Sequence, residues 1–251
     1  MHKTVEKKRK RRGLSASQLK LIGHVLLLLG IIGVTVIQNG LLRLESHTGE
    51  SLLTLLDSGN AMGLATAALL LQAAGNCALP IFAFLLTEGY QVSSSRKNYL
   101  FRLIGLAVIC ELPYDLAMTG EWVDPSVQNP VFALVVGMVM LYLFDHYSGK
   151  SGAAVIGIIV LIAAILWMGL LRVERGVVLV LLIAVLWWFR RSENTAMLLG
   201  CAVSAFAFPA PLGFFAVHYY NGERGRYPRT AAYLCYPVML LVIGLAGRYL
   251  L

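Results

Sequence analysis

The sequence predicts an all-α fold, a polytopic membrane bundle of about eight to ten helical membrane segments, some of them short or broken. Two observations support this prediction. The chain of 251 residues is 58% hydrophobic and only 14% charged, and its mean hydropathy is +0.73. Its apolar residues also gather in repeated long runs that do not alternate with polar residues, as the strands of a membrane barrel would.

Charge divides the chain into a tail and one membrane domain. Much of the net charge of +8 lies in a basic tail, residues 1–18, which reads KTVEKKRKRR from Lys3 to Arg12. Basic residues next to a first span favour the cytoplasm, so we expect a cytoplasmic N-terminus and a single transmembrane domain over residues 19–251. No aromatic residues are interleaved with the basic ones, so nothing indicates nucleic-acid binding. Membrane lipids are the expected partner of the tail.

Apolar runs separated by short charged loops define the expected spans. They cover residues 19–37, 77–90, 99–118, 130–144, 153–171, 176–189 and 231–251. Residues 61–74 form a run that is short for a crossing. This run is either a re-entrant or interfacial helix, or it is continuous with the next span through Gly75 and Asn76. We expect residues 39–59 and 119–128 to be loops on the outside.

The run over residues 195–220 leaves two topologies open, because Pro209 and Pro211 interrupt it. A single crossing would place Arg224 outside, whereas two short crossings or a re-entrant pair would place it inside. We favour the second topology, because basic residues then lie on the cytoplasmic side at every loop. Broken helices are tolerated where they are buried in protein or line a cavity.

Two carboxylates near the end of the third expected span are the strongest candidates for chemistry. Glu111 and Asp115 are four residues apart, so a helix brings them to one face, and Pro113 should kink or end that helix. Ionisable groups at membrane depth are costly and are often functional. Two close carboxylates repel, which lets one hold a proton and act as an acid or base near neutral pH. Alternatively, Glu111 pairs with Arg102 or with a neighbouring helix, while Asp115 reaches external water.

Two polar residues within the apolar runs are further candidates. Glu88 closes the second span, where it either faces a site or pairs with Arg96 or Lys97. His24 lies one turn after Lys20, and it is either a hydrogen-bonded core residue or a base that takes a proton from an acceptor.

Two loop segments carry candidates for binding. Asn129 precedes the fourth span, where an amide either caps the helix or contacts a substrate. Asn221 and Arg224 lie in the turn-forming sequence NGERG. Arg224 and the following Arg226 either hold the phosphates of a nucleotide-bearing cofactor or form a plain basic loop.

Several classes of site lack their sequence signature. The cysteines lie in or beside apolar runs without metal-ligand spacing, so we expect reduced thiols and no metal site; they are Cys77, Cys110, Cys201 and Cys235. The sequence also has no Walker loop, no GxGxxG that opens a helix and no GxSxG elbow.

Motifs over most of the chain resemble those of the TraX family of bacterial membrane proteins. The resemblance begins near Leu19 and is strongest from Gly75 to Gly137. Its motifs are GNCALPIFAFLLTEGY at 75–90, KNYLFR at 97–102, ELPYDLA at 111–117, QN at 128–129, NGERG at 221–225 and YP at 236–237.

This resemblance implies an integral membrane acyltransferase of the bacterial cytoplasmic membrane. The family's namesake is associated with N-acetylation of a conjugative pilin subunit, and the family is similar to polytopic transmembrane acyltransferases. Such enzymes take an acyl group from cytoplasmic acetyl-CoA or another acyl-CoA. They deliver it to an amine or hydroxyl acceptor, which here would be a protein N-terminus, a lipid or a glycan. The candidates then take three roles: catalysis (Glu111, Asp115, His24), substrate binding (Glu88, Asn129, Arg102) and acyl-CoA binding (Arg224, Asn221).

The sequence departs from the family pattern at four places. An Asp-His pair of the first span reads Gly30-Ile31, a Gly-Arg reads Gly75-Asn76, the His after the last-span Tyr-Pro is Met239, and an Asp-Tyr-Gly is Glu174-Arg175-Gly176. The first three changes remove polar groups suited to acyl transfer. The alternative function is therefore a catalytically degenerate TraX-like binding or assembly protein. A transporter is disfavoured, because the sequence shows no inverted repeat.

Overall fold

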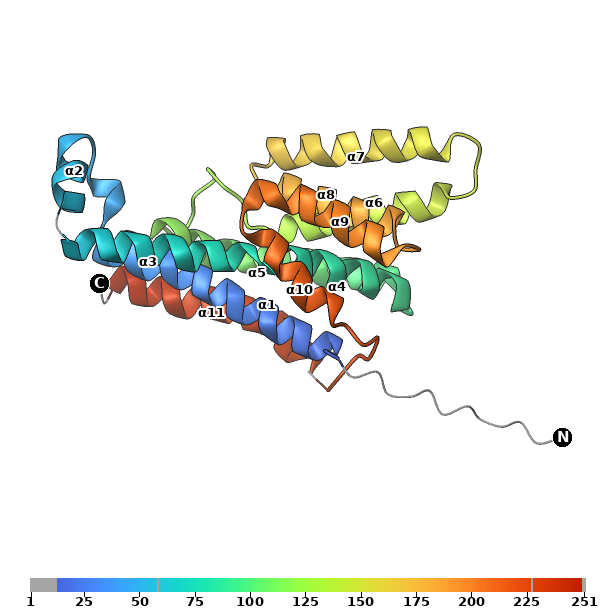
Figure 1. Cartoon of the computed structure of the whole chain (residues 1–251), viewed down its shortest axis with the longest axis horizontal. Coiled ribbons are helices and arrows are strands. Elements are labelled where there is room, and N and C mark those ends of the chain that lie inside the picture. The colour runs from blue at the N-terminus through green and yellow to red at the C-terminus, as the bar shows by residue number, and fades with distance from the viewer. Residues whose placement is uncertain (1–12, 58, 227, 250–251) are drawn as a thin grey trace.

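The computed structural model describes residues 13–57, 59–226 and 228–249. Within these ranges the protein is a bundle of helices without a β-strand, which confirms the all-α fold and the polytopic class. Most long helices lie roughly along one axis (Figure 1). We call the end at which the first helix begins the N-terminal end of the bundle, and the end at which the last helix finishes the opposite end.

The helices follow the order of the apolar runs. Their bounds are α1 Ala16–Ile31, the π-helical η1 Ile32–Leu41, η2 Leu44–Ser46, α2 Glu50–Asp57, α3 Gly59–Asn76, α4 Ala78–Val92, α5 Arg96–Thr119, α6 Val131–Tyr147, α7 Ala153–Leu170, α8 Gly176–Trp188, α9 Glu193–Ser204, η3 Ala205–Ala207, η4 Ala210–Leu212, α10 Gly213–His218 and α11 Arg229–Tyr249. Among the described residues, the stretches 16–41, 59–92, 153–170 and 230–249 are long and apolar enough to cross a membrane. Helices α6 and α8 are apolar but shorter.

Three local expectations need correction. Residues 61–74 are not a separate re-entrant or interfacial helix, because α3 and α4 follow each other in one apolar stretch of 34 residues. The expected outer loop 39–59 contains the helix α2, whose short amphipathic pattern is too brief to register as a span. Helix α5 does not end at Pro113 but continues to Thr119, where Gly120 terminates it with a positive φ.

Capping residues fix the starts of two helices at the N-terminal end. Ser15 and Gln18 form a capping box at the start of α1, in which each side chain bonds the other's backbone amide. The Ser95 hydroxyl accepts a hydrogen bond from the Asn98 backbone amide at the start of α5. These caps set where α1 and α5 enter the bundle, and both helices later line the candidate site.

The interior is built around α4, which contacts α1, α6, α8 and α10. Helix α11 lies along α5, and α1 lies along α3 and α4, whereas α7 is the outermost helix of the bundle (Figure 1). Small residues allow the closest approach of α1 and α3: a Cβ added at Gly30 would lie 3.2 Å from the Gly75 Cα. The two backbones therefore pack directly on each other.

An ion pair fastens α4, α5 and α6 together at the N-terminal end. Arg96 Nη1 lies 2.5 Å from Asp145 Oδ2, which also accepts a hydrogen bond from the Tyr90 hydroxyl at 3.3 Å. The Arg96 guanidinium lies over the Tyr90 ring, 4.2 Å from its centroid, and the edge of this ring contacts Trp187 of α8. These contacts join α4, α5, α6 and α8 at this end.

The chain reverses its direction within residues 193–218, as the favoured topology of two short crossings or a re-entrant pair requires. Helix α9 runs away from the N-terminal end, the turns η3 and η4 reverse the chain, and α10 runs back (Figure 1). The following loop then contacts the first described residues, because the Leu14 amide donates to the Tyr219 carbonyl at 2.7 Å and the Ala16 amide to the Glu223 carbonyl at 2.8 Å. Arg224 therefore lies at the N-terminal end, as expected.

Candidate functional site

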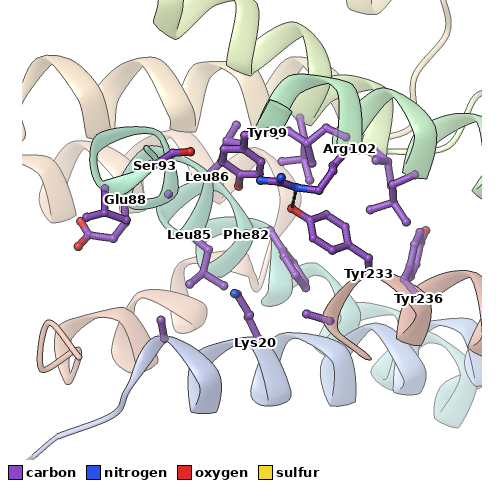
Figure 2. A pocket seen from close by; sticks show the side chains of 18 of the residues that line it. Lys20, Phe82, Leu85, Leu86, Glu88, Ser93, Tyr99, Arg102, Tyr233 and Tyr236 are labelled. Carbon is purple, nitrogen blue, oxygen red and sulfur yellow. Dashed lines mark hydrogen bonds between the residues drawn. The ribbon is translucent and has the colours of Figure 1, made fainter. Parts of the chain in front are cut away.

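A cavity of about 760 Å³ opens at the N-terminal end of the bundle. Its walls come from α1, α4, α5, α6 and α11, with contributions from α8, the 93–95 loop and the 220–224 loop. Four residues singled out from the sequence line this cavity: His24, Glu88, Arg102 and Arg224. Figure 2 shows Lys20, Glu88 and Arg102 around the same space, on three different helices. The fold thus collects polar groups that are far apart in the sequence.

The rise of 1.5 Å per helical residue gives the depth of each group. On α1, Lys20 lies about 6 Å and His24 about 12 Å beyond the first residue, Ala16. Arg102 lies about 9 Å beyond the start of α5. On α1, His24 thus lies about one turn deeper than Lys20. Arg102 lies near the level of His24, because its partner Tyr233 is adjacent to Ala232, which contacts His24.

His24 is almost fully buried, with 5% of its surface exposed. Its Nδ1 lies 2.7 Å from the Lys20 carbonyl, and its second backbone partner is Ala232 of α11. The edge of the ring contacts Phe82, with 5.5 Å between the ring centroids. These contacts hold the imidazole between α1, α4 and α11, so the expectation of a hydrogen-bonded core histidine is met. The ring also reaches the cavity.

Two charged residues of the cavity, Glu88 on α4 and Arg102 on α5, each form a hydrogen bond with a tyrosine hydroxyl. Arg102 Nε donates to the Tyr233 hydroxyl at 3.4 Å, and the Tyr220 hydroxyl donates to Glu88 Oε1 at 3.3 Å. Arg102 thus pairs with a tyrosine of α11 and not with Glu111. Glu88 in turn does not take Arg96 as its partner, because Arg96 binds Asp145.

The NGERG loop supplies the rim of the cavity. Arg224 is exposed there, and its carbonyl accepts hydrogen bonds from both the amide and the hydroxyl of Ser17. Asn221 does not line the cavity: its amide group donates to the Gly13 carbonyl, and its Oδ1 accepts the Glu223 amide. Arg224 thus lies where a phosphate could reach it, whereas Asn221 shapes the loop.

Glu111 and Asn129 lie at the opposite end of the bundle, outside the lining of the cavity. Asn129 is fully buried and its side-chain amide donates to the Ala107 carbonyl and to Glu111 Oε2. Its Oδ1 accepts the Val131 amide at 3.0 Å, which caps the first turn of α6. Asn129 therefore takes the capping role that the sequence offered as one alternative, and its bond to Glu111 also joins α5 to α6.

Asp115 holds the loop between α5 and α6. Its Oδ2 accepts the Asp124 amide at 3.0 Å, and its Oδ1 is buried without a hydrogen-bond partner among the described residues. Asp115 is 3% exposed, so it does not reach external water as the alternative reading proposed. Hydrogen bonds from the Ser126 backbone and side chain lower the pKa of Asp124 in this loop.

Tyr236 lies between the cavity and the opposite-end polar residues. Its side chain lines the cavity and is within electrostatic range of Glu111 and Glu174. Behind it, the Tyr114 hydroxyl donates to Glu174 Oε2 at 2.5 Å. The lining of the cavity thus includes none of the three residues Glu111, Asp115 and Asn129. The cavity ends at Tyr236 and at neighbouring residues such as Val131.

Comparison with protein families decides which group of proteins the chain belongs to. A family model described as TraX protein matches residues 15–246, nearly the whole chain. The chain belongs to the TraX family. Comparisons with curated proteins and with solved structures gave no match.

Two of the departures from the TraX pattern have a structural counterpart. The Asp position of the expected pair is Gly30, which packs against the backbone at Gly75, so the space for a side chain is occupied by α3. The missing last-span histidine is Met239, whose sulfur lies 3.4 Å from Cys235 Sγ within α11. At both places packing contacts replace polar groups of the family pattern.

Some lining residues of this TraX-family cavity escaped the sequence analysis, above all its tyrosines. Tyr99 and Tyr233 face the same space as Arg102 (Figure 2). A signal for them exists in the sequence, because Tyr99 precedes Arg102 by three residues, and Tyr233 precedes Tyr236 by three. Residues at this spacing share a helix face, so both tyrosines could have been assigned to the surface that carries Arg102 and the Tyr-Pro motif.

Proposed function

We propose that this TraX-family protein is an acyltransferase of the bacterial cytoplasmic membrane. It takes an acyl group from acetyl-CoA or another acyl-CoA and transfers it to an amine or hydroxyl acceptor. One observation carries the proposal: the cavity brings His24, Lys20, Arg102 and Arg224 together from separate helices and loops. Cationic groups at the mouth suit the phosphates of CoA, and an imidazole farther in suits proton transfer.

The distribution of basic residues supports a cytoplasmic N-terminal end. Arg96, Lys97, Lys150, Arg190, Arg191, Arg224 and Arg226 all lie in loops or helix termini at this end. The loop after α5 carries Glu121 and Asp124 at the opposite end. Because basic loops favour the cytoplasm, the cavity would open toward the compartment that contains acyl-CoA.

The proposed step uses His24 as the base. The acceptor nitrogen or oxygen attacks the thioester carbonyl carbon, the C–S bond breaks, and the CoA sulfur leaves as a thiolate. His24 takes the proton that the acceptor loses and returns it to the sulfur. The contact between His24 and the Ala232 backbone has to open for the ring to reach the acceptor.

The test is transfer of a labelled acyl group in membranes of expressing cells. Labelled acetyl-CoA should yield labelled protein, lipid or glycan, and His24→Gln should lower the transfer at least about 100-fold. His146→Gln is the matched control, because His146 is an exposed histidine at the same end and does not line the cavity. Equal transfer by His24→Gln and the unaltered protein would remove the imidazole from the mechanism.

The same assay tests the catalytic role that the sequence assigns to Glu111 and Asp115. Both lie outside the cavity lining, and both hold backbone or amide groups of the α5–α6 connection. Glu111→Gln keeps a hydrogen-bonding side chain at the position. A strong loss of transfer in a folded Glu111→Gln protein would give this carboxylate a part in the chemistry, and unchanged transfer would leave it a structural one.

A non-catalytic binding or assembly protein is the second candidate, and one observation favours it. The Gly30–Gly75 contact fills the place of the family's Asp with helix packing. On this alternative, the cavity binds acyl-CoA saturably but membranes form no labelled product. Gly30→Asp would not restore activity, because the new carboxylate would meet the α3 backbone; we expect it to separate α1 from α3 and destabilise the protein by about 1–3 kcal/mol. A stable, more active Gly30→Asp protein would contradict this.

A further inference from the structure

The cavity continues inward past its polar residues into an apolar section. Leu27 lies three residues beyond His24 on α1, and Leu106 lies four residues beyond Arg102 on α5. On α4 the lining extends from Glu88 inward to Leu79, nine residues farther along the helix axis. By the helical rise, this section is roughly 5–13 Å deep, depending on the wall. An acetyl group would leave it empty.

The inner section is lined almost entirely by carbon. Leu27, Leu79, Phe82, Leu106 and Leu134 are half-buried and face the space, and Tyr236 closes it. Apolar surface of this kind, left to water, is unfavourable, so a ligand that covers it gains free energy. Figure 2 shows Tyr236 farther into the bundle than Lys20 and Arg102, and Phe82 between Arg102 and the helix that carries Lys20.

The outer section selects the charge of the ligand. Lys20 and Arg224 line the outer cavity, and Arg102 lies at its inner boundary. Among the described lining residues Glu88 is the single acidic one, and it accepts a hydrogen bond from Tyr220. A ligand that satisfies both sections has an anionic head group and an apolar chain.

We infer that the donor is an acyl-CoA with a medium or long acyl chain, which lies in the apolar inner section while the phosphates of CoA lie at the basic mouth. This inference rests on the proposed function and names its substrate class. The thioester then lies near His24, at the boundary between the two sections. Affinity should rise about fourfold with each methylene group that enters the inner section, and it should level off when that section is full.

The experiment measures equilibrium binding to the full chain in nanodiscs, with labelled CoA, acetyl-CoA, octanoyl-CoA and palmitoyl-CoA as probes. Octanoyl-CoA should bind at least 100-fold more tightly than acetyl-CoA. Leu134→Trp places a bulky indole ring in the inner section, and it should reduce the affinity ratio of octanoyl-CoA to acetyl-CoA to below about tenfold. Leu166→Trp is the matched control, because Leu166 lies on α7 with 67% of its surface exposed and away from the cavity. Arg224→Gln should weaken all four probes by a similar factor.

The outcomes separate the inference from the function on which it rests. Equal affinities for acetyl-CoA and octanoyl-CoA, together with acetyl transfer in membranes, would overturn the inference and leave the proposed function standing. Chain-length preference that is unchanged in a folded Leu134→Trp protein, or that is equal in empty nanodiscs, would show that the chain enters lipid and would overturn it as well. Absence of binding by any acyl-CoA would overturn both.

Discussion

The two ends of the bundle use buried polar residues in different ways. At the opposite end, Glu111, Asn129 and Asp115 bond to backbone and side-chain groups of the α5–α6 connection. At the N-terminal end, His24 and Arg102 are also hydrogen-bonded, yet they border a space large enough for a ligand. A polar group in an apolar helix is costly, so it indicates a structural or a chemical role. Whether a cavity adjoins the group distinguishes the two roles.

The orientation of the protein in the membrane gives the test with the largest expected effect, because each introduced cysteine is either labelled or unlabelled. Ser94 is exposed at the N-terminal end and Ser126 is exposed at the opposite end. In intact spheroplasts, a membrane-impermeant maleimide should label Ser126→Cys and leave Ser94→Cys unlabelled, and inside-out vesicles should reverse the pattern. The unaltered protein, with its own four cysteines, supplies the background. The reverse pattern would place the cavity on the external side and separate it from acyl-CoA.

Removal of the buried amide at the opposite end should have the next largest effect. Asn129→Ala removes the side-chain amide that donates to Glu111 and the cap of the first turn of α6, so the free energy of unfolding should fall by about 2–3 kcal/mol. The measurement is the thermal midpoint in detergent, with Gln128→Ala as the neighbouring amide control. Acyl-CoA binding by the protein that remains folded should be unchanged. A folded variant that loses only binding would assign Asn129 to the ligand site.

The ion pair between Arg96 and Asp145 should contribute least to the free energy of unfolding. Arg96→Ala removes the bond to Asp145 and the cation–π contact with Tyr90, and we expect a loss of about 1 kcal/mol. The side chains of this pair are 41% and 35% exposed, so salt should screen much of the Coulomb attraction. Comparison of Arg96→Ala with Arg96→Lys at low and high ionic strength checks this. A salt-independent loss of several kcal/mol of unfolding free energy would show that this contact, and not helix packing, holds α4, α5 and α6 together at this end.

Hydropathy and charge were sufficient to predict the fold class and most helix positions. The apolar runs predicted the long helices, and Pro209 and Pro211 together with the basic loops predicted the reversal of the chain between α9 and α10. The helix α2 was missed because one short amphipathic segment is not distinguishable from a polar loop by hydropathy. Pro113 was expected to be able to end α5, but the flanking apolar residues pack against α11 and keep the chain helical.

The site was predictable only in part, because the sequence gives the face of a helix but not its neighbour. The spacing of Glu111 and Asp115 does place both carboxylates on α5, yet the loop that binds Asp115 through the Asp124 amide could not be foreseen. Lys20 and His24 were visible as a pair one turn apart. That this pair shares a cavity with Arg102 and Arg224 depends on how α1, α5 and α11 cross.

The continuous stretch of α3 and α4 also determines how the protein sits in the bilayer. Its 34 residues are about 51 Å long, whereas the hydrocarbon layer is about 30 Å thick. Tilt alone would have to exceed the usual range of up to about 40° to hide that length. Part of this rod therefore projects into the headgroup zone, and α2 lies at the end where α3 begins (Figure 1). A thicker membrane should hence cover more of this rod, and a thinner membrane should cover less. Bilayer thickness should therefore change how deeply the protein is immersed, without any ligand.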